Sequence, residues 1–170
     1  MSAIDLQMSS SGDEVERDLA AADVAWAIDG LLPAGKSVDD LLDEADVLAD
    51  GVGSYRGRVA TLDSSELVEL MTTLATIGEF GSLAGHYAML RFSEDTSDPE
   101  RGAAMQSMQE RSTAISTKLI FVDLEFAAAD DEHVALVLAD QRLEFCRHHL
   151  ENLRRNRPHL LSEPEEMVLT

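Results

Sequence analysis

Apolar residues spaced by three and four positions are the feature that most constrains this chain, because that spacing places them along one side of an α-helix. The longest such stripe has the members Val38, Leu41, Ala45, Leu48, Val52, Tyr55, Val59 and Leu62. Further stripes run through positions 67–90, 105–126 and 143–153. An Ala-rich segment, Glu14–Ile28, carries a shorter one and predicts a first helix. The pattern therefore predicts helices along almost the whole chain.

Capping signals predict where these helices begin. Three stripes follow a side chain that can accept a hydrogen bond from a free backbone N–H: Ser37 with Asp40, Asp63 with Glu66, and Asp98 followed by Pro99. Pro158 predicts the end of the last helix, because proline disfavours helical geometry at the residue before it. Glycines at positions 51, 53 and 57 lie inside the longest stripe, and each costs up to about 1 kcal/mol relative to alanine. We expect that helix to bend or break there.

Composition agrees with a helical fold. Aromatic residues make up only 5% of the 170 residues and prolines number 4, whereas apolar residues reach 45%. This balance favours helix over strand. The sequence predicts an all-α protein, an antiparallel multi-helix bundle of about five to seven helices. Residues 1–12 are expected to form a loose N-terminal tail and residues 13–170 a helical domain.

Charge excludes several classes of partner. The chain has 33 acidic residues against 13 Lys and Arg, a formal net charge of -20 at pH 7, so it would repel nucleic acids and anionic membranes. The sequence contains no uninterrupted run of about 18 apolar residues, so no membrane span is predicted. No signal peptide is visible either, and a cytoplasmic protein is expected. The single cysteine, Cys146, lies on an apolar stripe, which favours a buried thiol over a nucleophile.

One motif suggests nucleotide binding. Residues Gly30–Ser37 match G-x-x-x-x-G-K-[ST], in which amides and a lysine bind phosphates and a hydroxyl binds magnesium. Leu119–Asp123 has the form of the second ATPase motif, four apolar residues before an acid. Such proteins need a parallel sheet, for which this sequence offers too few β-rich segments. A linker followed by a helix cap is the favoured interpretation, and nucleotide binding through Gly30–Ser37 is the remote alternative.

No metal site is predicted within the chain. It contains no H-E-x-x-H, and the adjacent His148 and His149 would point about 100° apart on a helix. Basic residues form one cluster: Arg142, Arg147, Arg154, Arg155 and Arg157. These arginines can hold a peptide carboxylate or can pair with the acidic faces of neighbouring helices. The second interpretation is favoured, because weak surface pairs are common.

Several segments form an ordered set over about four fifths of the chain: Tyr55–Ala60, Tyr87–Phe92, Asp95–Pro99, Gln109–Arg111, Leu119–Glu125, Cys146–Leu150 and Arg157–Glu166. The first segment resembles Y-R-G-[KR]-V-A, and the second and third together resemble Y-A-x-L…D-T-x-D-P. The fourth and fifth together resemble Q-E-R…L-x-F-F-x-L-E. Together the set resembles the N-terminal helical region of the oligoendopeptidase F family, zinc metallopeptidases related to the thimet-like oligopeptidases. Val122 departs from the Phe-Phe pair of the family pattern.

The resemblance implies a helical N-terminal portion that roofs a peptide channel above a separate catalytic domain, which is absent from these 170 residues. That family's enzymes hydrolyse short peptides with a zinc ion held by H-E-x-x-H and a later Glu. No catalytic, cofactor-binding or metal-binding residue can be assigned here, so zinc is expected only in a full-length member and the chain alone is predicted to be inactive. Its expected partners are its own catalytic domain and short peptides.

Residues proposed from the sequence for the channel or the interface are Tyr87, Arg147, His148, His149, Arg157 and His159. An alternative of a different class remains open. The chain can be a free-standing acidic helical interaction module descended from such a domain, with a partner captured from the cell.

Overall fold

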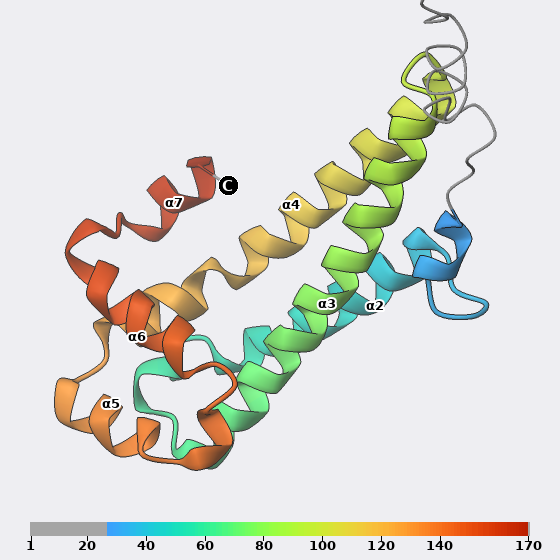
Figure 1. The fold of residues 1–170 in the computed structure, drawn as a ribbon. Coiled ribbons are helices and arrows are strands. Elements are labelled where there is room, and N and C mark those ends of the chain that lie inside the picture. The colour runs from blue at the N-terminus through green and yellow to red at the C-terminus, as the bar shows by residue number, and fades with distance from the viewer. Residues whose placement is uncertain (1–26, 170) are drawn as a thin grey trace, which may run out of the picture.

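A computed structural model describes residues 27–169, and these residues form an all-α fold, as predicted (Figure 1). No strand occurs among them. The α-helices are α2 (Val38–Val52), α3 (Ser64–Glu94), α4 (Pro99–Ala128), α5 (Asp131–Leu138), α6 (Arg147–Asn156) and α7 (Glu163–Leu169). The predicted tail over residues 1–12 lies outside the described residues, as does nearly all of the helix predicted over Glu14–Ile28.

Short 3-10 helices flank the α-helices: η2 (Ile28–Leu31) precedes α2, and η3 (Gly53–Tyr55), η4 (Val59–Thr61), η5 (Gln141–Leu143) and η6 (Arg157–His159) lie between later α-helices. The long helices α3 and α4 form an antiparallel hairpin, and α2 packs along both of them (Figure 1). At the other end of the hairpin from its turn, α5 and α6 gather beside the C-terminal end of α4. Helix α7 then returns toward α4, which it contacts.

The predicted caps begin the three long helices. Ser37 and Asp40 form a capping box on α2, in which the Asp40 amide is 3.1 Å from the Ser37 Oγ. Asp63 and Glu66 form a second capping box on α3. Asp98 caps α4, whose first residue is Pro99. Because each cap satisfies backbone N–H groups that have no partner inside the helix, these boundaries could be read from local sequence.

The expected break in the longest stripe is confirmed. Helix α2 ends at Val52, and the chain continues through η3 and η4 rather than as helix. Gly57 adopts a φ of +80° between them. Although the helix stops, Val59 and Leu62 are each only 2% exposed. The stripe therefore predicted burial correctly even beyond Val52, where the α-helix has ended.

Two basic residues of α4, seven positions apart, form ion pairs with acidic residues of α2. Arg111 on α4 lies 2.9 Å from Asp39 and 2.5 Å from Asp43 on α2. One heptad further along, Lys118 lies 2.7 Å from both Asp46 and Asp50. Each cation thus bridges two acids one turn apart, and these contacts use the acidic outer face of α2.

The core is continuous through the helical bundle. Its most enclosed large side chains come from α2, α3, α4, η5 and α6: Leu42, Leu67, Leu70, Phe121, Leu143 and Leu150. No polar or charged side chain is buried among the described residues. Aliphatic packing therefore supplies the main stabilising contribution.

The stripe at positions 143–153 was expected to form one helix, and the structure corrects this. Leu143 ends the 3-10 helix η5, and α6 starts only at Arg147. Cys146, at the break, has φ -120° and ψ 0°, outside the helical region. Leu143, Cys146 and Leu150 are all buried nevertheless. Two turns of different kind can present the same face as one helix, so the spacing could not reveal the break.

Candidate functional site

Three segments that are distant in the sequence meet at Arg56, in the turn between η3 and η4. Its guanidinium carbon is 4.1 Å from the centre of the Phe121 ring on α4, within cation–π range. Its Nη1 atom lies 2.7 Å from Oε1 of Glu163, the first residue of α7. One side chain therefore ties the η3–η4 turn to α4 and to α7.

Glu125 on α4 holds the same turn through its backbone. Its carboxylate accepts hydrogen bonds from the amide of Gly57 at 2.8 and 3.0 Å and from the amide of Val59 at 3.1 Å. Irregular backbone needs such partners when it packs against a core. We call Arg56, Phe121, Glu125 and Glu163 the Arg56 junction. Its members belong to three of the segments that carry the family resemblance.

The approach to α7 is fixed by carboxylates of its own first turn. The amide and the hydroxyl of Ser162 donate to Glu165 at 2.9 and 2.5 Å, and the Leu161 amide donates to Glu166 at 2.9 Å. The bonds from Ser162 hold the pKa of the Glu165 carboxyl below its usual value. The run Ser-Glu-Pro-Glu-Glu is thus a helix start, and it presents Glu163 to Arg56.

A groove of about 410 Å³ lies between α4 and the segment from η6 to α7. Phe121, Leu124, Glu125, Ala127 and Ala128 line it from α4, and Arg157, Leu160, Leu161, Ser162 and Glu163 line it from the opposite side. Leu161 is 46% exposed. Beyond the groove, α7 exposes its own apolar residues, with Met167 at 47% and Val168 at 84%. Apolar surface is therefore concentrated at this end of the chain.

Two arginines of α6 bind backbone carbonyls. Arg154 donates to the carbonyls of Ala127 at 2.7 Å and Ala129 at 2.5 Å, at the C-terminal end of α4, and it pairs with Asp131. Arg147 donates to the carbonyl of Leu138 at the end of α5 and pairs with Glu144 at 2.8 Å. The predicted pairing with acids of neighbouring helices is seen for Arg154, whose partner Asp131 lies on α5, whereas Arg147 pairs with an acid only three residues before it in the chain.

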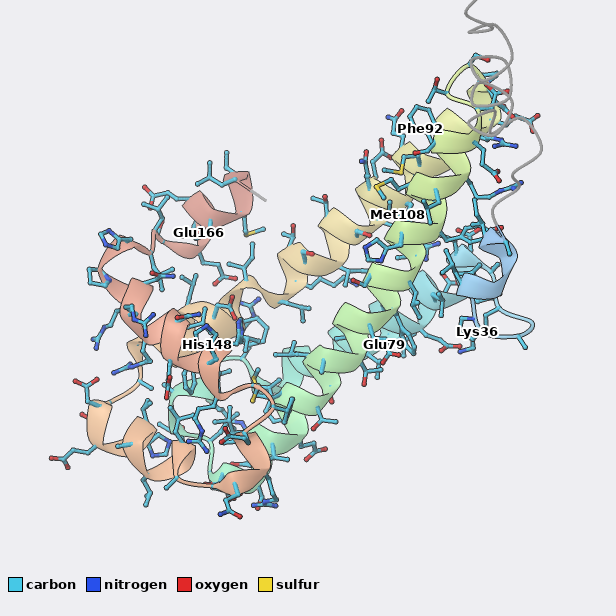
Figure 2. All side chains as sticks on the ribbon, viewed as in Figure 1. Lys36, Glu79, Phe92, Met108, His148 and Glu166 are labelled. Carbon is cyan, nitrogen blue, oxygen red and sulfur yellow. The ribbon has the colours of Figure 1, made fainter. Side chains whose placement is uncertain are left out.

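The proposed site residues fall into two separate regions. Arg147, His148 and His149 lie on α6, followed by Arg157 and His159 in η6. His148 contacts the side chain of Asn152 at 3.0 Å. Tyr87 instead lines a cavity of about 530 Å³ between α3, α4 and the start of α2, with Met108 and five charged residues in its walls: Asp39, Arg91, Asp98, Glu100 and Arg101. Figure 2 shows Met108 far along the hairpin from His148, so one site cannot contain all six residues.

Sequence reasoning missed the members of the Arg56 junction as site residues. Each lies inside a segment quoted for the resemblance, but a motif does not reveal that its residues touch another motif. The separation of Arg56 and Glu163 is 107 residues. The only available signal was that a charged or aromatic residue recurs in each of three ordered segments.

Two titratable side chains near α6 have pKa values shifted mainly by burial. Desolvation raises the pKa of the Asp123 carboxyl on α4, and the nearby His149 opposes that shift. Desolvation also raises the pKa of the Cys146 thiol, which is 7% exposed. The predicted buried core thiol is confirmed, since burial lowers thiolate content and reactivity.

Neither a metal site nor a nucleotide loop is built by the described residues. No group of three His, Cys, Asp or Glu side chains among them could hold a metal ion, so zinc has no set of ligands in residues 27–169. Within Gly30–Ser37, the Lys36 ammonium lies 2.5 Å from Glu44 and the Ser37 hydroxyl belongs to the α2 cap. Helix η2 and a turn precede α2, where a phosphate-binding loop would follow a strand.

Comparison with known proteins agrees with the motif set. The family model for oligopeptidase F matches residues 125–170, which include Glu125, α6 and α7. Oligopeptidase PepF of Bacillus subtilis (strain 168) is 24% identical over 156 residues, which cover 91% of this chain. This chain is similar to the N-terminal region of oligopeptidase F. The resemblance predicted from the ordered segments is thereby confirmed.

The match leaves most of the relative uncovered. The chain spans 23% of the length of PepF. No solved structure matches it. Among residues 27–169, no helix is both long enough and apolar enough to cross a membrane. Because the described residues are helical and the chain spans only 23% of PepF, the similarity concerns one helical region of that enzyme.

Proposed function

We propose that this chain is the N-terminal domain of a zinc metallo-oligoendopeptidase that hydrolyses short peptides. In this proposal it shapes the substrate channel and packs on the catalytic domain. The observation that carries it is the Arg56 junction, where three segments of the family pattern converge beside an apolar groove. Metal chemistry would come entirely from outside residues 27–169, and this part would contribute shape and contact surface.

The surface proposed to face the catalytic domain is the exposed apolar end formed by Leu161, Met167 and Val168. Large apolar side chains exposed next to one another favour association, and here they lie at the end of the segment that the family model matches. The junction favours the observed position of α7, because Arg56 contacts both Phe121 and Glu163. A fixed α7 would direct the rest of the enzyme onto one side of the hairpin.

The decisive experiment uses the native protein. An antibody against this chain should detect, in the source cell, a product several times larger than 18.5 kDa. That product, purified with the antibody, should cleave short peptides and lose activity with a zinc chelator. A native product of 18.5 kDa would sink the proposal and leave the free-standing acidic module as the better description. The continuous core seen here is compatible with either result.

A pair of valine substitutions tests the packing surface in that larger product. Val168→Lys on α7 should weaken the fit to the catalytic domain and lower peptidase activity. Val47→Lys, on α2, makes the same change at a valine that is 71% exposed and should leave activity unchanged. Equal activity in both variants would show that α7 does not face the catalytic domain.

A further inference from the structure

The charges around the groove between α4 and η6–α7 are unequally compensated. Glu163 is paired with Arg56, and Glu125 accepts the amides of Gly57 and Val59. Arg157, which lines the same groove, makes no hydrogen bond or ion pair through its guanidinium with any described residue. The groove therefore presents, beside an apolar floor, one guanidinium whose donors have no partner among the described residues, while the oxygens of the negatively charged Glu125 already accept backbone amides.

This arginine is exceptional in so acidic a chain. Its neighbours in the basic cluster have partners: Arg142 binds Asp140, Arg147 binds Glu144, Arg154 binds Asp131, and Arg155 binds the Asn152 side chain. The charge of Arg157 also reaches Arg154, where it adds to burial in lowering the pKa of that guanidinium. An anion beside Arg157 would relieve this repulsion between like charges.

The nearby end of α4 does not oppose an anion. Unpaired carbonyls at a helix C-terminus carry partial negative charge, but here Arg154 donates to the carbonyls of Ala127 and Ala129. Ala127 and Ala128 then give the groove a nonpolar wall next to Arg157. The arrangement combines a free guanidinium with apolar contacts, which suits a ligand that ends in a carboxylate and carries an apolar side chain.

We propose that this groove binds the C-terminal end of a short peptide, with the terminal carboxylate on Arg157 and apolar side chains against Leu124, Ala128 and Leu160. This inference rests on the proposed function, in which short peptides are the substrates. An inorganic anion could pair with Arg157 but would make no apolar contacts. An internal segment of the remaining enzyme could pack on the apolar floor but would bring no terminal carboxylate to Arg157. A peptide with a free carboxyl end satisfies both.

Groove length sets how much of the peptide would be held. From Phe121 to Ala128 the helix α4 advances roughly 10 Å at 1.5 Å per residue. An extended peptide covers that distance with about three residues. Binding should therefore strengthen from an acetylated dipeptide to an acetylated tripeptide and change little when a fourth residue is added.

The test compares acetyl-Ala-Ala-Leu with a free carboxylate and the same peptide with a C-terminal amide. Binding to the 170-residue chain would be measured by amide chemical shifts at about 0.15 M salt, where long-range repulsion is largely screened. The free acid should bind about tenfold more tightly than the amide, the size expected for loss of one charged hydrogen-bonded contact. Equal binding of the two peptides, or no binding by either at millimolar concentration, would overturn the proposal.

Matched arginine variants locate the effect. Arg157→Gln should remove the preference for the free acid, whereas Arg155→Gln, two residues away and outside the groove lining, should keep it. Circular dichroism would check that both variants fold. If both variants lose the preference equally, the anion is held by general basicity and the proposed site is wrong. A peptide result of that kind would leave the antibody experiment unaffected, so the two proposals can fail separately.

Discussion

Arg154 supplies a cap that the end of α4 lacks in its own sequence. Its guanidinium bonds to carbonyls at the end of that helix and to Asp131, although it belongs to α6. Planar geometry with several donors lets one arginine serve several acceptors. From the sequence, this residue was only one of five in a basic cluster. Only the fold separates the arginines that complete helix ends from Arg157, which remains without a described partner.

Asp123 gives a prediction at the same scale. Partial burial raises the pKa of its carboxyl above the ordinary value of 3.8. Between the two pKa values the folded state binds more protons, so the free energy of unfolding falls as pH rises through that window. Above the folded pKa the penalty is fully present. Asp123→Asn should therefore raise the free energy of unfolding at neutral pH, and the gain should become small near pH 4 and vanish below it.

Urea unfolding at pH 7 and pH 4 measures this difference. Glu79→Gln, at an exposed carboxyl on α3, serves as the control for the loss of one negative charge. A gain of equal size in both variants would mean that relief of net charge, rather than burial of Asp123, is responsible. Destabilisation by Asp123→Asn at neutral pH would contradict the prediction outright.

At the scale of elements, two glycines of the same stripe have opposite requirements. Gly51 lies in helical geometry in α2, and a Cβ there would meet nothing within 4 Å. Gly57 is equally open but has φ +80°. Gly51→Ala should stabilise the protein by about 0.5–1 kcal/mol through helix propensity. Gly57→Ala should destabilise it by about 1–2 kcal/mol through backbone strain.

Thermal unfolding of the two variants checks both signs in one experiment. Because neither added methyl group would clash, any difference between them must come from the backbone. Stabilisation by Gly57→Ala would show that the turn above Glu125 can adopt another conformation. Loss of stability in Gly51→Ala would mean that the last turn of α2 is not helical in solution.

Local signals account for what the sequence predicted about the elements. Caps at Ser37, Asp63 and Asp98 each act within three residues, so helix starts could be placed from short windows. The break before α6 could not, because Leu143 and Leu150 keep helical spacing across it. The Arg56 junction was beyond reach for another reason: it depends on how three remote segments fold onto one another.

For the whole molecule, magnitudes decide how salt should act. The described ion pairs are mostly exposed, and each exposed pair is worth at most about 1 kcal/mol. Against them stands a net charge of -20, whose self-repulsion opposes the compact state. Raising the salt concentration from about 0.01 M to about 0.15 M shortens the Debye length from about 30 Å to about 8 Å. Tm should therefore rise over this range.

Potassium chloride is the suitable salt for this measurement, since sulfate would also strengthen apolar burial. The Lys118→Met variant removes two of the four ion pairs described between α2 and α4 and should show a steeper rise in Tm, because one attractive cation has been removed. A fall in Tm with salt in the parent chain would mean that the ion pairs outweigh the net repulsion.

The separation of Arg56 from Glu163 has a consequence for biosynthesis. The partners of Arg56 appear in order: Phe121 is translated first, and Glu163 follows roughly forty residues later. At 5–20 residues per second this interval lasts about 2–8 s. During it the nascent hairpin can already bury its core, while the side of α4 that will receive α7 stays open. Chaperones and proteases therefore have a defined interval in which to act on this one face, and it closes only when the last helix emerges.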